Sequence, residues 1–164
     1  MLKYLCLITN KKKCDNSLLM KNLHDILKKE NYKKVKFKIT KTQHLLIKAK
    51  INGVLGNFIL DTGASSSCIG FESVDLFLLE AQTSKTKASG AGATGMFTQI
   101  ATDNHLQLGS WKDNSFALVI FDLSHVNEAL VQHKAKPVHG IIGADILMKG
   151  KAIVDYYNHY LYLL

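Results

Sequence analysis

The chain has 164 residues, of which 47% are hydrophobic and 21% are charged, a balance that fits one globular domain with its own core. It has no long repeat or low-complexity tract, which argues against a disordered chain, and no window approaches the roughly eighteen apolar residues of a membrane span. All 21 basic residues are Lys, so no guanidinium group is present for bidentate recognition of a carboxylate, a phosphate or a guanine edge.

The positive charge is concentrated at the N-terminal end of the chain. Residues 1–50 contain 14 Lys and 3 acidic residues, whereas residues 51–164 contain 7 Lys and 10 acidic residues. A basic segment can bind nucleic acid or a lipid surface, but it is also typical of a solvated helix and strand. We favour the second interpretation, because no aromatic side chains alternate with the Lys residues as a base-stacking surface requires.

The cysteines give no sign of a disulfide framework. Cys6, Cys14 and Cys68 are odd in number and form no Cys-x-x-Cys motif, which argues against a disulfide scaffold and against a zinc site. A reducing compartment is the simpler interpretation. The apolar run within residues 1–8 is too short for a signal peptide, and the Lys residues after it leave no small-residue cleavage site. We therefore expect a cytoplasmic location.

The first predicted element is a helix over residues 17–30. Its apolar residues recur at spacings of three and four, Ser17 can cap its first turn, and two Lys residues suit the negative end of its dipole. Strands are predicted to follow. Residues 33–40 alternate Lys with apolar side chains, which is typical of a half-buried strand, and residues 45–51 form a second strand.

A hairpin then leads to the most informative segment of the chain. Asn52-Gly53 favours a type I′ turn, in which both central residues have positive φ. The return strand over residues 54–60 ends in Phe58-Ile59-Leu60, a continuous apolar run that predicts burial on both faces. Asp61 follows this run directly.

The second half of the chain predicts short strands and one helix. Residues 84–98 indicate a glycine-rich hairpin with a mobile tip, and Ser124 is expected to cap a helix over about 125–135 that stops before Pro137. Further strands are predicted at residues 106–109, 116–121, 153–156 and 160–164, the last two as a hairpin around Asn158. Short strands at this spacing predict a mostly β fold, a β-barrel with one or two helices.

Asp61-Thr62-Gly63 combines a carboxylate, a hydroxyl and a glycine at the end of a buried strand. The glycine permits a tight turn that aims the carboxylate out of the barrel. A carboxylate in so apolar a place needs hydrogen bonds or a partner with which it shares a proton. The alternative interpretation is a structural Asp in a turn.

Four motifs follow one another in a fixed order around this tripeptide. The run from Phe58 to Ser65, after the Asn-Gly turn, matches a catalytic loop, and residues 87–92 resemble a flap. Ile141 to Asp145 match an apolar-apolar-glycine stretch that lies beneath such a loop, and residues 154–163 resemble closing strands. Together they resemble the retropepsin-like aspartic proteases, single-domain relatives of pepsin, in their bacterial form. The resemblance implies a closed retropepsin-like (acid protease) β-barrel over residues 35–164, and it leaves residues 1–34 as a basic N-terminal extension with an amphipathic helix.

The resemblance implies an aspartic endopeptidase that needs no cofactor and no metal. Its catalytic residues are Asp61, Thr62 and Gly63, and the expected substrate-binding residues are Ala64, Ser65, Ser89, Gly90, Ala91, Gly92 and Ile142. Amide hydrolysis needs a base to activate water and an acid to protonate the carbonyl oxygen and then the amine. Two nearby carboxylates that share one proton supply both. Because the chain has one Asp-Thr-Gly, a homodimer is expected to supply the second carboxylate.

The resemblance also implies that the terminal strands of two subunits interleave. The tail Tyr160–Leu164 is apolar for a chain end, and a lone apolar edge strand is an aggregation liability unless another strand pairs with it. We therefore expect this tail to pair with the partner subunit.

Other interpretations remain open at this point. The same fold could serve as a catalytically silent peptide-binding or dimerisation module, and residues 1–50 could bind nucleic acid. His125, His133 and His139 lack the helical spacing of metal ligands, so solvated or core histidines are favoured. Cys68 is expected to be a small buried side chain rather than a nucleophile.

Overall fold

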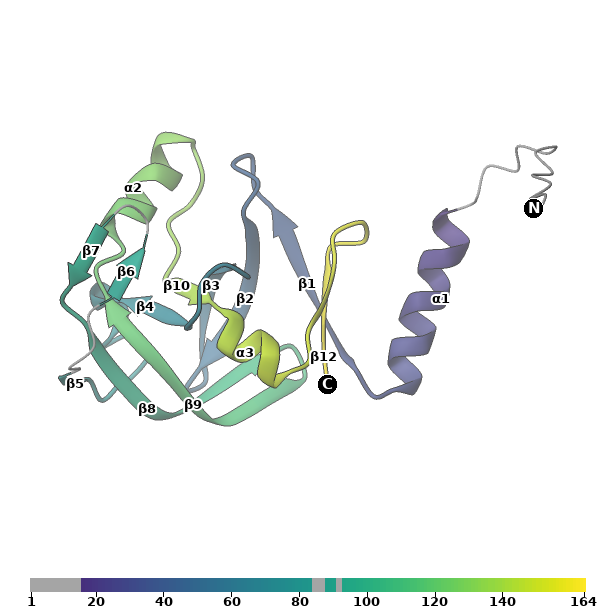
Figure 1. Cartoon of the computed structure of the whole chain (residues 1–164), viewed down its shortest axis with the longest axis horizontal. Coiled ribbons are helices and arrows are strands. Elements are labelled where there is room, and N and C mark those ends of the chain that lie inside the picture. The colour runs from purple at the N-terminus through teal and green to yellow at the C-terminus, as the bar shows by residue number, and fades with distance from the viewer. Residues whose placement is uncertain (1–15, 84–87, 91–92) are drawn as a thin grey trace, which may run out of the picture.

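The computed structural model describes residues 16–83, 88–90 and 93–164 (Figure 1). Its main sheet has ten strands in the order β11-β12-β1-β2-β3-β10-β4-β9-β8-β5, and β2 also pairs with β8. This additional pairing closes the strands from β2 through β3, β10, β4 and β9 to β8 into a barrel. The prediction of a closed β-barrel with few helices is therefore confirmed.

The bounds of the elements follow the chain. The helices are α1 (Asn16–Lys29), α2 (Ser124–Gln132) and α3 (Ala144–Lys149), with a 3-10 turn at Phe71–Ser73. The strands are β1 (Lys33–Ile39), β2 (Leu45–Ile51), β3 (Val54–Leu60), β4 (Cys68–Gly70), β5 (Gln82–Thr83), β6 (Ala88–Gly90), β7 (Ala93–Met96), β8 (Gln99–Leu108), β9 (Trp111–Phe121), β10 (Gly140–Ile142), β11 (Ile153–Asp155) and β12 (Tyr160–Leu163). Within the described part of the chain, no helix has the length and hydropathy of a membrane span.

β2 and β3 form the hairpin that leads to Asp61. Asn52 and Gly53 at its turn have φ angles of 49° and 86°, as the predicted type I′ turn requires. The Asn52 side chain donates hydrogen bonds to the Phe77 carbonyl (2.9 Å) and to Asn104 Oδ1 (2.8 Å). The turn is therefore tied to the wall of the barrel as well as shaped by its own residues.

The core lies inside the barrel, with a smaller cluster beneath α2. Ile47 and Phe58 are fully buried in the main core. The smaller cluster consists of Ile59, Leu130 and Val138. Because β3 contributes to both clusters, its last residues are buried on both faces, which confirms the prediction from the apolar run. Each such large side chain contributes about 1.5–3 kcal/mol to stability through its burial.

β8 and β9 are longer than the sequence pattern indicates. The pattern predicts strands at residues 106–109 and 116–121, whereas the structure extends both strands and joins them through Gly109, whose φ is 60°. The register of the pair shifts on both sides of Asn104, and Asp103 has a φ of 60°. Such bulges break the two-residue periodicity, so the pattern shows only the regular parts of the two strands.

α2 begins and ends differently from the prediction. Ser124 is its first residue rather than its cap, and Asp122 Oδ1 accepts hydrogen bonds from the Ser124 hydroxyl (2.5 Å) and N–H (2.8 Å). These bonds lower the pKa of the Asp122 carboxyl. The helix ends at Gln132 rather than near 135, since Lys134 adopts a left-handed conformation with a φ of 58°.

In the described part of the basic N-terminal segment, the first two elements are α1 and β1. α1 confirms the first predicted helix, and its Leu27 is buried. β1 begins at Lys33, and its Lys side chains are exposed, with Lys34 Nζ 4.4 Å from the centroid of the Tyr160 ring. The division into residues 1–34 and 35–164 thus crosses β1, and it stays a prediction.

β12 corrects the expectation that the apolar tail, residues 160–164, pairs with a partner subunit. Leu161 is opposite Val35 of β1 and opposite Val154 of β11, so the strand is paired on both sides within one chain. Trp111 Nε1 also donates a hydrogen bond to the carbonyl of the last residue (2.9 Å). The apolar tail is therefore accommodated inside the subunit, and Leu161 is fully buried.

Candidate active site

Asp61 is the first residue beyond β3, at a point fixed by two neighbouring strands. β10 runs parallel to β3 with Ile142 opposite Leu60, and the Asp61 N–H donates to the Ile142 carbonyl (3.0 Å). Leu60 and Ile142 are 4% and 1% exposed, whereas Asp61 is partly exposed. The carboxylate therefore stands where the chain leaves the core.

The loop after Asp61 folds back on its carboxylate. The Gly63 N–H donates to Asp61 Oδ1 (2.8 Å), and the Ala64 N–H donates to the Asp61 carbonyl (3.3 Å). A Cβ at Gly63 would lie only 3.2 Å from Oδ1, so a residue without a side chain suits this close approach. Thr62 and Gly63 are exposed, as a site that receives a substrate requires.

Asp145 holds the far end of the loop, and this role was missed by reasoning from the sequence. Its Oδ1 accepts a hydrogen bond from the Ser67 hydroxyl (2.7 Å), and its Oδ2 accepts one from the Ser67 N–H (2.9 Å). The Ser67 hydroxyl in turn accepts a bond from the Gly143 N–H (2.9 Å). The Ala144 N–H donates to the Ala64 carbonyl (2.7 Å). The first turn of α3 and the loop are thus joined at several points.

Gly143 lies where the Asp61 loop and the start of α3 pack too closely for any other residue. A Cβ at this position would lie 2.8 Å from the Ala64 carbonyl oxygen and 2.8 Å from the Ser66 carbonyl carbon, which is closer than real Cβ atoms come. The glycine of the apolar-apolar-glycine motif is therefore explained by this close packing. The motif was the one sequence pattern that indicated which residues lie beneath the Asp61 loop.

The predicted substrate-binding residues fall into three groups. Ala64 and Ser65 lie in the loop beside Asp61, while Ser89 and Gly90 lie in β6. Ala91 and Gly92 lie outside the described residues. Ile142 differs from the expectation, because its side chain is buried in the main core, so it supports the loop from below rather than offering surface to a peptide.

The predicted glycine-rich hairpin is present as β6 and β7. These strands pair antiparallel, with Ala88 opposite Met96, in a two-stranded sheet separate from the barrel sheet (Figure 1). Beyond β7, the exposed Phe97 stacks on Phe71, with ring centroids 6.1 Å apart. The hairpin therefore forms a sheet of its own, beside the barrel sheet.

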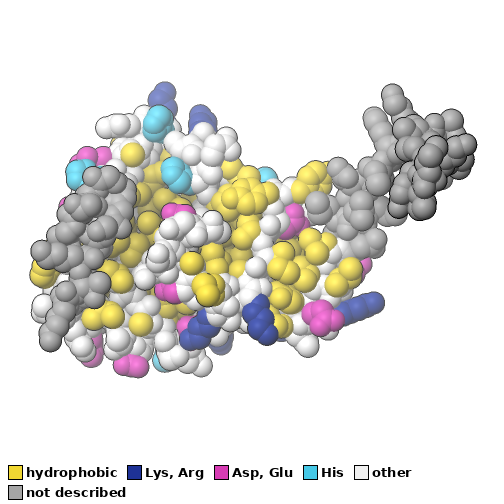
Figure 2. Space-filling model, in the orientation of Figure 1, with side chains coloured by type: hydrophobic (Ala, Val, Ile, Leu, Met, Phe, Trp, Pro, Cys, Tyr) yellow, Lys and Arg dark blue, Asp and Glu magenta, His cyan; other side chains and the backbone are white. Residues whose placement is uncertain are grey.

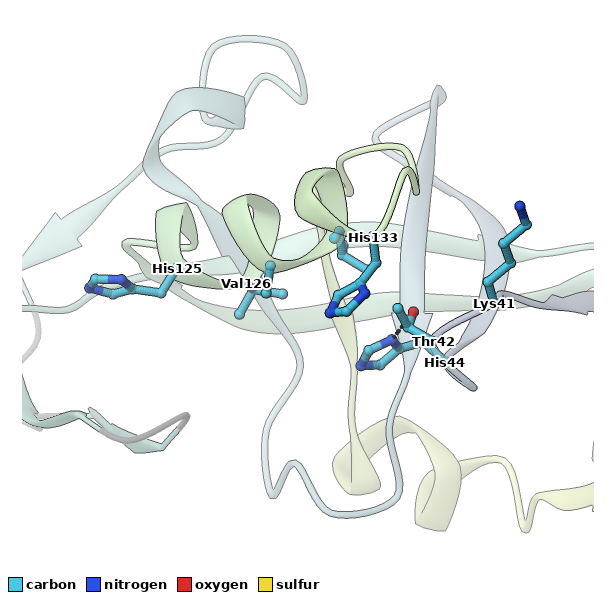
Figure 3. Close-up of a pocket in the computed structure, with 8 residues that line it drawn as sticks. Lys41, Thr42, His44, His125, Val126 and His133 are labelled. Atoms are coloured by element: carbon cyan, nitrogen blue, oxygen red, sulfur yellow. Dashed lines mark hydrogen bonds between the residues drawn. The ribbon is translucent and has the colours of Figure 1, made fainter.

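A cavity of about 610 Å³ lies elsewhere, between α2 and the turn that joins β1 to β2 (Figure 3). His44 and His133 face the same space from these two segments, and His44 Nδ1 is 2.7 Å from Thr42 Oγ1. Its lining residues include none from the Asp61 loop, so it is separate from the candidate active site. Among the described residues, no group of three or more His, Cys, Asp or Glu could hold a metal.

His139 and Cys68, which the sequence analysis considered as a metal ligand and a nucleophile, both take part in packing. His139 Nδ1 accepts a hydrogen bond from the Asn57 N–H (3.0 Å), and its ring packs on Phe58 and Phe77. Cys68 is a free, buried thiol, and its burial raises its pKa to about 12. A thiol with so high a pKa carries almost no thiolate at neutral pH, so it is a poor nucleophile.

The profile of the family described as aspartyl protease matches residues 47–146 of this chain. The match runs from β2 through the Asp61 loop and the β6–β7 segment into α3, and so includes Asp145. A comparison with curated proteins found no match.

Solved structures of similar fold include three proteases or protease-like domains. A retropepsin-like aspartic protease from Rickettsia conorii has a TM-score of 0.55 at 15% identity, covering 80% of this chain and 90% of that chain. EIAV protease in complex with the inhibitor HBY-793 has a TM-score of 0.51 at 18% identity, covering 68% and 92%. The retroviral protease-like domain of Ddi1 from Leishmania major has a TM-score of 0.50 at 19% identity, covering 73% and 87%.

At these identities the structural likeness shows the fold, which is the retropepsin-like barrel. The family profile goes further, because it spans more than half of the chain and contains Asp61-Thr62-Gly63. The chain belongs to the aspartyl protease family.

Proposed function

We propose that the chain is an aspartic endopeptidase whose catalytic pair consists of Asp61 from each of two copies. The observation that carries this proposal is the setting of Asp61. Its carboxylate is partly exposed at the end of a buried strand, in a loop held by Gly63, Ser67 and Asp145. A catalytic carboxylate must be fixed in position and still reach the substrate, and the hydrogen bond from the Gly63 N–H and the partial exposure of Asp61 support that role.

The chemistry follows from two carboxylates that share one proton, because like charges so close do not both ionise. The ionised carboxylate takes a proton from a water molecule as the water oxygen attacks the peptide carbonyl carbon. The protonated carboxylate donates its proton to the carbonyl oxygen. When the tetrahedral intermediate breaks, the carboxylate that took the water proton donates it to the amine nitrogen, the other carboxylate takes a proton from a hydroxyl of the intermediate, and the carbon–nitrogen bond is cleaved. Neither step requires a cofactor.

The remaining predicted residues take supporting roles in this proposal. Thr62, exposed beside Asp61, hydrogen-bonds to the matching loop of the partner and fixes the distance between the two carboxylates. Ala64 and Ser65 contact an extended peptide from below. Ser89 and Gly90, in β6, cover the peptide from the other side and exclude water. Apolar side chains of the substrate are expected near the cleaved bond.

The test compares peptide cleavage by the wild-type chain and by the Asp61→Asn variant, using a mixture of peptides with apolar residues. The amide has nearly the same shape but cannot act as a general base, so cleavage should fall at least about a thousandfold. The matched control is Asp75→Asn, which changes an exposed carboxylate elsewhere and should leave the rate unchanged. Retained cleavage in purified Asp61→Asn protein would place the chemistry at another residue.

A second candidate function is a peptide-binding module without catalysis. The observation in its favour is that one chain provides one carboxylate at the site, so the fold alone does not make a catalytic pair. The same experiment separates the two functions. Peptide binding without cleavage by wild-type protein would favour the module.

A further inference from the structure

The outer face of β1 and β2 carries a dense group of Lys side chains. Every second residue of these strands is buried in the main core, and these inward residues are Val35, Phe37, Ile47, Ala49 and Ile51. The residues between them point outward. They include five exposed Lys residues, which we call the Lys face: Lys34, Lys36, Lys38, Lys48 and Lys50. Along each strand these residues lie about 7 Å apart, so their charges form a compact patch.

The strands around the Lys face carry no acidic side chain. β12, β1, β2 and β3 lie side by side in the sheet (Figure 1), and none of these four described strands contains Asp or Glu. In the described part of the chain, the salt bridge joins Lys149 to Asp113 and includes no residue of the Lys face. On the face that Figure 2 shows, hydrophobic side chains gather near the middle and Lys side chains are scattered. The positive charge is therefore not spread evenly over the surface.

The neighbours of these Lys residues across the sheet do not neutralise them. Phe37 is opposite Ile47, which places Lys36 beside Lys48 on the outer face. Asn57 lies on the other side of Lys48. Like charges that face each other across two strands destabilise the sheet. The free chain therefore has an unfavourable repulsion here, and a bound anion would relieve it.

Tyr160 supports the Lys face without removing its charge. This residue of β12 is opposite Lys36, and the centroid of its ring lies 4.4 Å from Lys34 Nζ and 5.9 Å from Lys36 Nζ. A cation–π contact positions an ammonium group over a ring and leaves its positive charge in place. The two ammonium groups are thus held at the surface by a neutral partner.

We propose that the Lys face binds the phosphate backbone of a duplex nucleic acid, independently of base sequence. Duplex DNA carries one negative charge per about 1.7 Å of its axis, and Lys side chains that contact phosphates release the counterions that surround it. Contacts to phosphates position a protein on a duplex but do not read its sequence. The chain has no Arg, which makes the commonest specific contact to guanine. The surface is therefore suited to backbone binding alone.

A duplex is favoured over a single strand. Sites for single strands stack successive bases on aromatic rings, and no such rings alternate with the Lys residues in the sequence. The fold brings Tyr160 to the Lys face, but this ring is half-buried and already in contact with Lys34. Binding to a duplex backbone needs no stacking, so the lack of aromatic rings does not count against it.

A duplex is also favoured over a lipid membrane. Stable attachment to a membrane needs an apolar anchor in addition to a basic patch. Leu46, opposite Lys38, packs against the cluster beneath α2 and is only half-buried there. Leu55, opposite Lys50, is 53% exposed, but one Leu side chain is a weak anchor. The charge of this surface thus exceeds its apolar content.

The test measures binding of the full chain to short, mixed-sequence DNA and RNA duplexes by fluorescence anisotropy at several salt concentrations. The logarithm of the association constant should fall linearly with the logarithm of the salt concentration, by about 0.9 for each phosphate contacted. Lys36→Gln/Lys48→Gln removes two contacts, so this slope should become less steep by about 1.8. Binding of this variant at about 0.1 M salt should be at least about tenfold weaker than that of wild type.

Two variants serve as controls for charge and position. Lys36→Arg/Lys48→Arg keeps both positive charges and should keep the wild-type slope. Lys151→Gln removes one charge at an exposed position between α3 and β11 and should leave the slope unchanged, whereas Lys36→Gln alone should reduce it by about 0.9. All variants should keep the wild-type circular dichroism spectrum, because the substituted side chains are exposed.

The same measurements can overturn the proposal. Equal changes of slope in Lys36→Gln and Lys151→Gln would show that net charge, and not the Lys face, decides binding. Tighter binding to a single strand, or to phosphatidylserine vesicles, than to either duplex would identify a different partner. A strong preference between two duplexes of unrelated sequence would contradict binding through the backbone alone.

Discussion

Replacing Asp145 by Ala would remove the carboxylate that holds the Asp61 loop to α3. Ser67 is fully buried and gives this carboxylate two hydrogen bonds, from its N–H at 2.9 Å and from its hydroxyl at 2.7 Å. A buried donor left without an acceptor costs about 1–3 kcal/mol. Asp145 is itself partly exposed, so water can replace part of what is lost. We expect Asp145→Ala to lower the free energy of unfolding by about 3 kcal/mol.

Urea unfolding followed by circular dichroism measures this loss. For a chain of this size, about 3 kcal/mol corresponds to a fall of roughly 6–12 °C in the melting temperature. Asp145→Asn keeps one acceptor oxygen and should cost about half as much. The control is Asp75→Ala, at an exposed carboxylate, which should cost less than about 0.5 kcal/mol. If Asp145→Ala and Asp75→Ala lost the same stability, the hydrogen bonds to Ser67 would not be holding the loop.

Three further predictions follow from other contacts. Asp113 is buried, which acts to raise its pKa, but hydrogen bonds from Lys149 (2.7 and 2.8 Å) and from Ser115, together with the charge of Lys149, outweigh burial and lower the pKa. Asp113→Asn should therefore lower the free energy of unfolding above about pH 4. The difference in this free energy between wild type and variant should shrink as the pH falls below that value. If the difference stayed constant between pH 7 and pH 2, the ion pair would be contradicted. Gly140→Ala should prevent folding to a soluble barrel, because a Cβ there would lie 2.1 Å from the Cys68 carbonyl oxygen, and a normal melting temperature for this variant would refute the packing of β10 on β4. Deletion of Tyr160–Leu164 should unfold the subunit itself, so that circular dichroism shows a disordered chain; a folded monomer would show that β12 is dispensable to the subunit.

Features set by neighbouring residues could be predicted from the sequence. The Asn52-Gly53 turn needs only positive φ at two adjacent positions, and both are observed. The run from Phe58 to Leu60 is buried on both faces because β3 lies between the main core and the cluster under α2. Asp61 comes directly after this run, so its location at the end of a buried strand could also be predicted. The barrel and the candidate loop were therefore predictable from local chemistry together with the family resemblance.

Features set by distant residues could not be predicted in this way. Asp145 and Ser67 are 78 positions apart, and nothing in either segment alone indicates that their side chains meet. The bulges around Asn104 hid the full length of β8, because they interrupt its alternation. The apolar pattern of β12 indicated a buried strand but not which strands flank it, and so the tail was assigned to a partner. The cytoplasmic location stays a prediction.

The claim that the two catalytic carboxylates come from two chains is tested most directly by mixing subunits. Wild-type protein and Asp61→Asn protein are unfolded together, refolded at a constant total concentration, and assayed for peptide cleavage at several ratios. A mixed dimer holds one Asp61 and should be inactive, so activity should fall as the square of the wild-type fraction, to about one quarter at an equal ratio. Activity that falls in direct proportion, to about one half at an equal ratio, would show that one Asp61 is sufficient and would contradict the two-chain site.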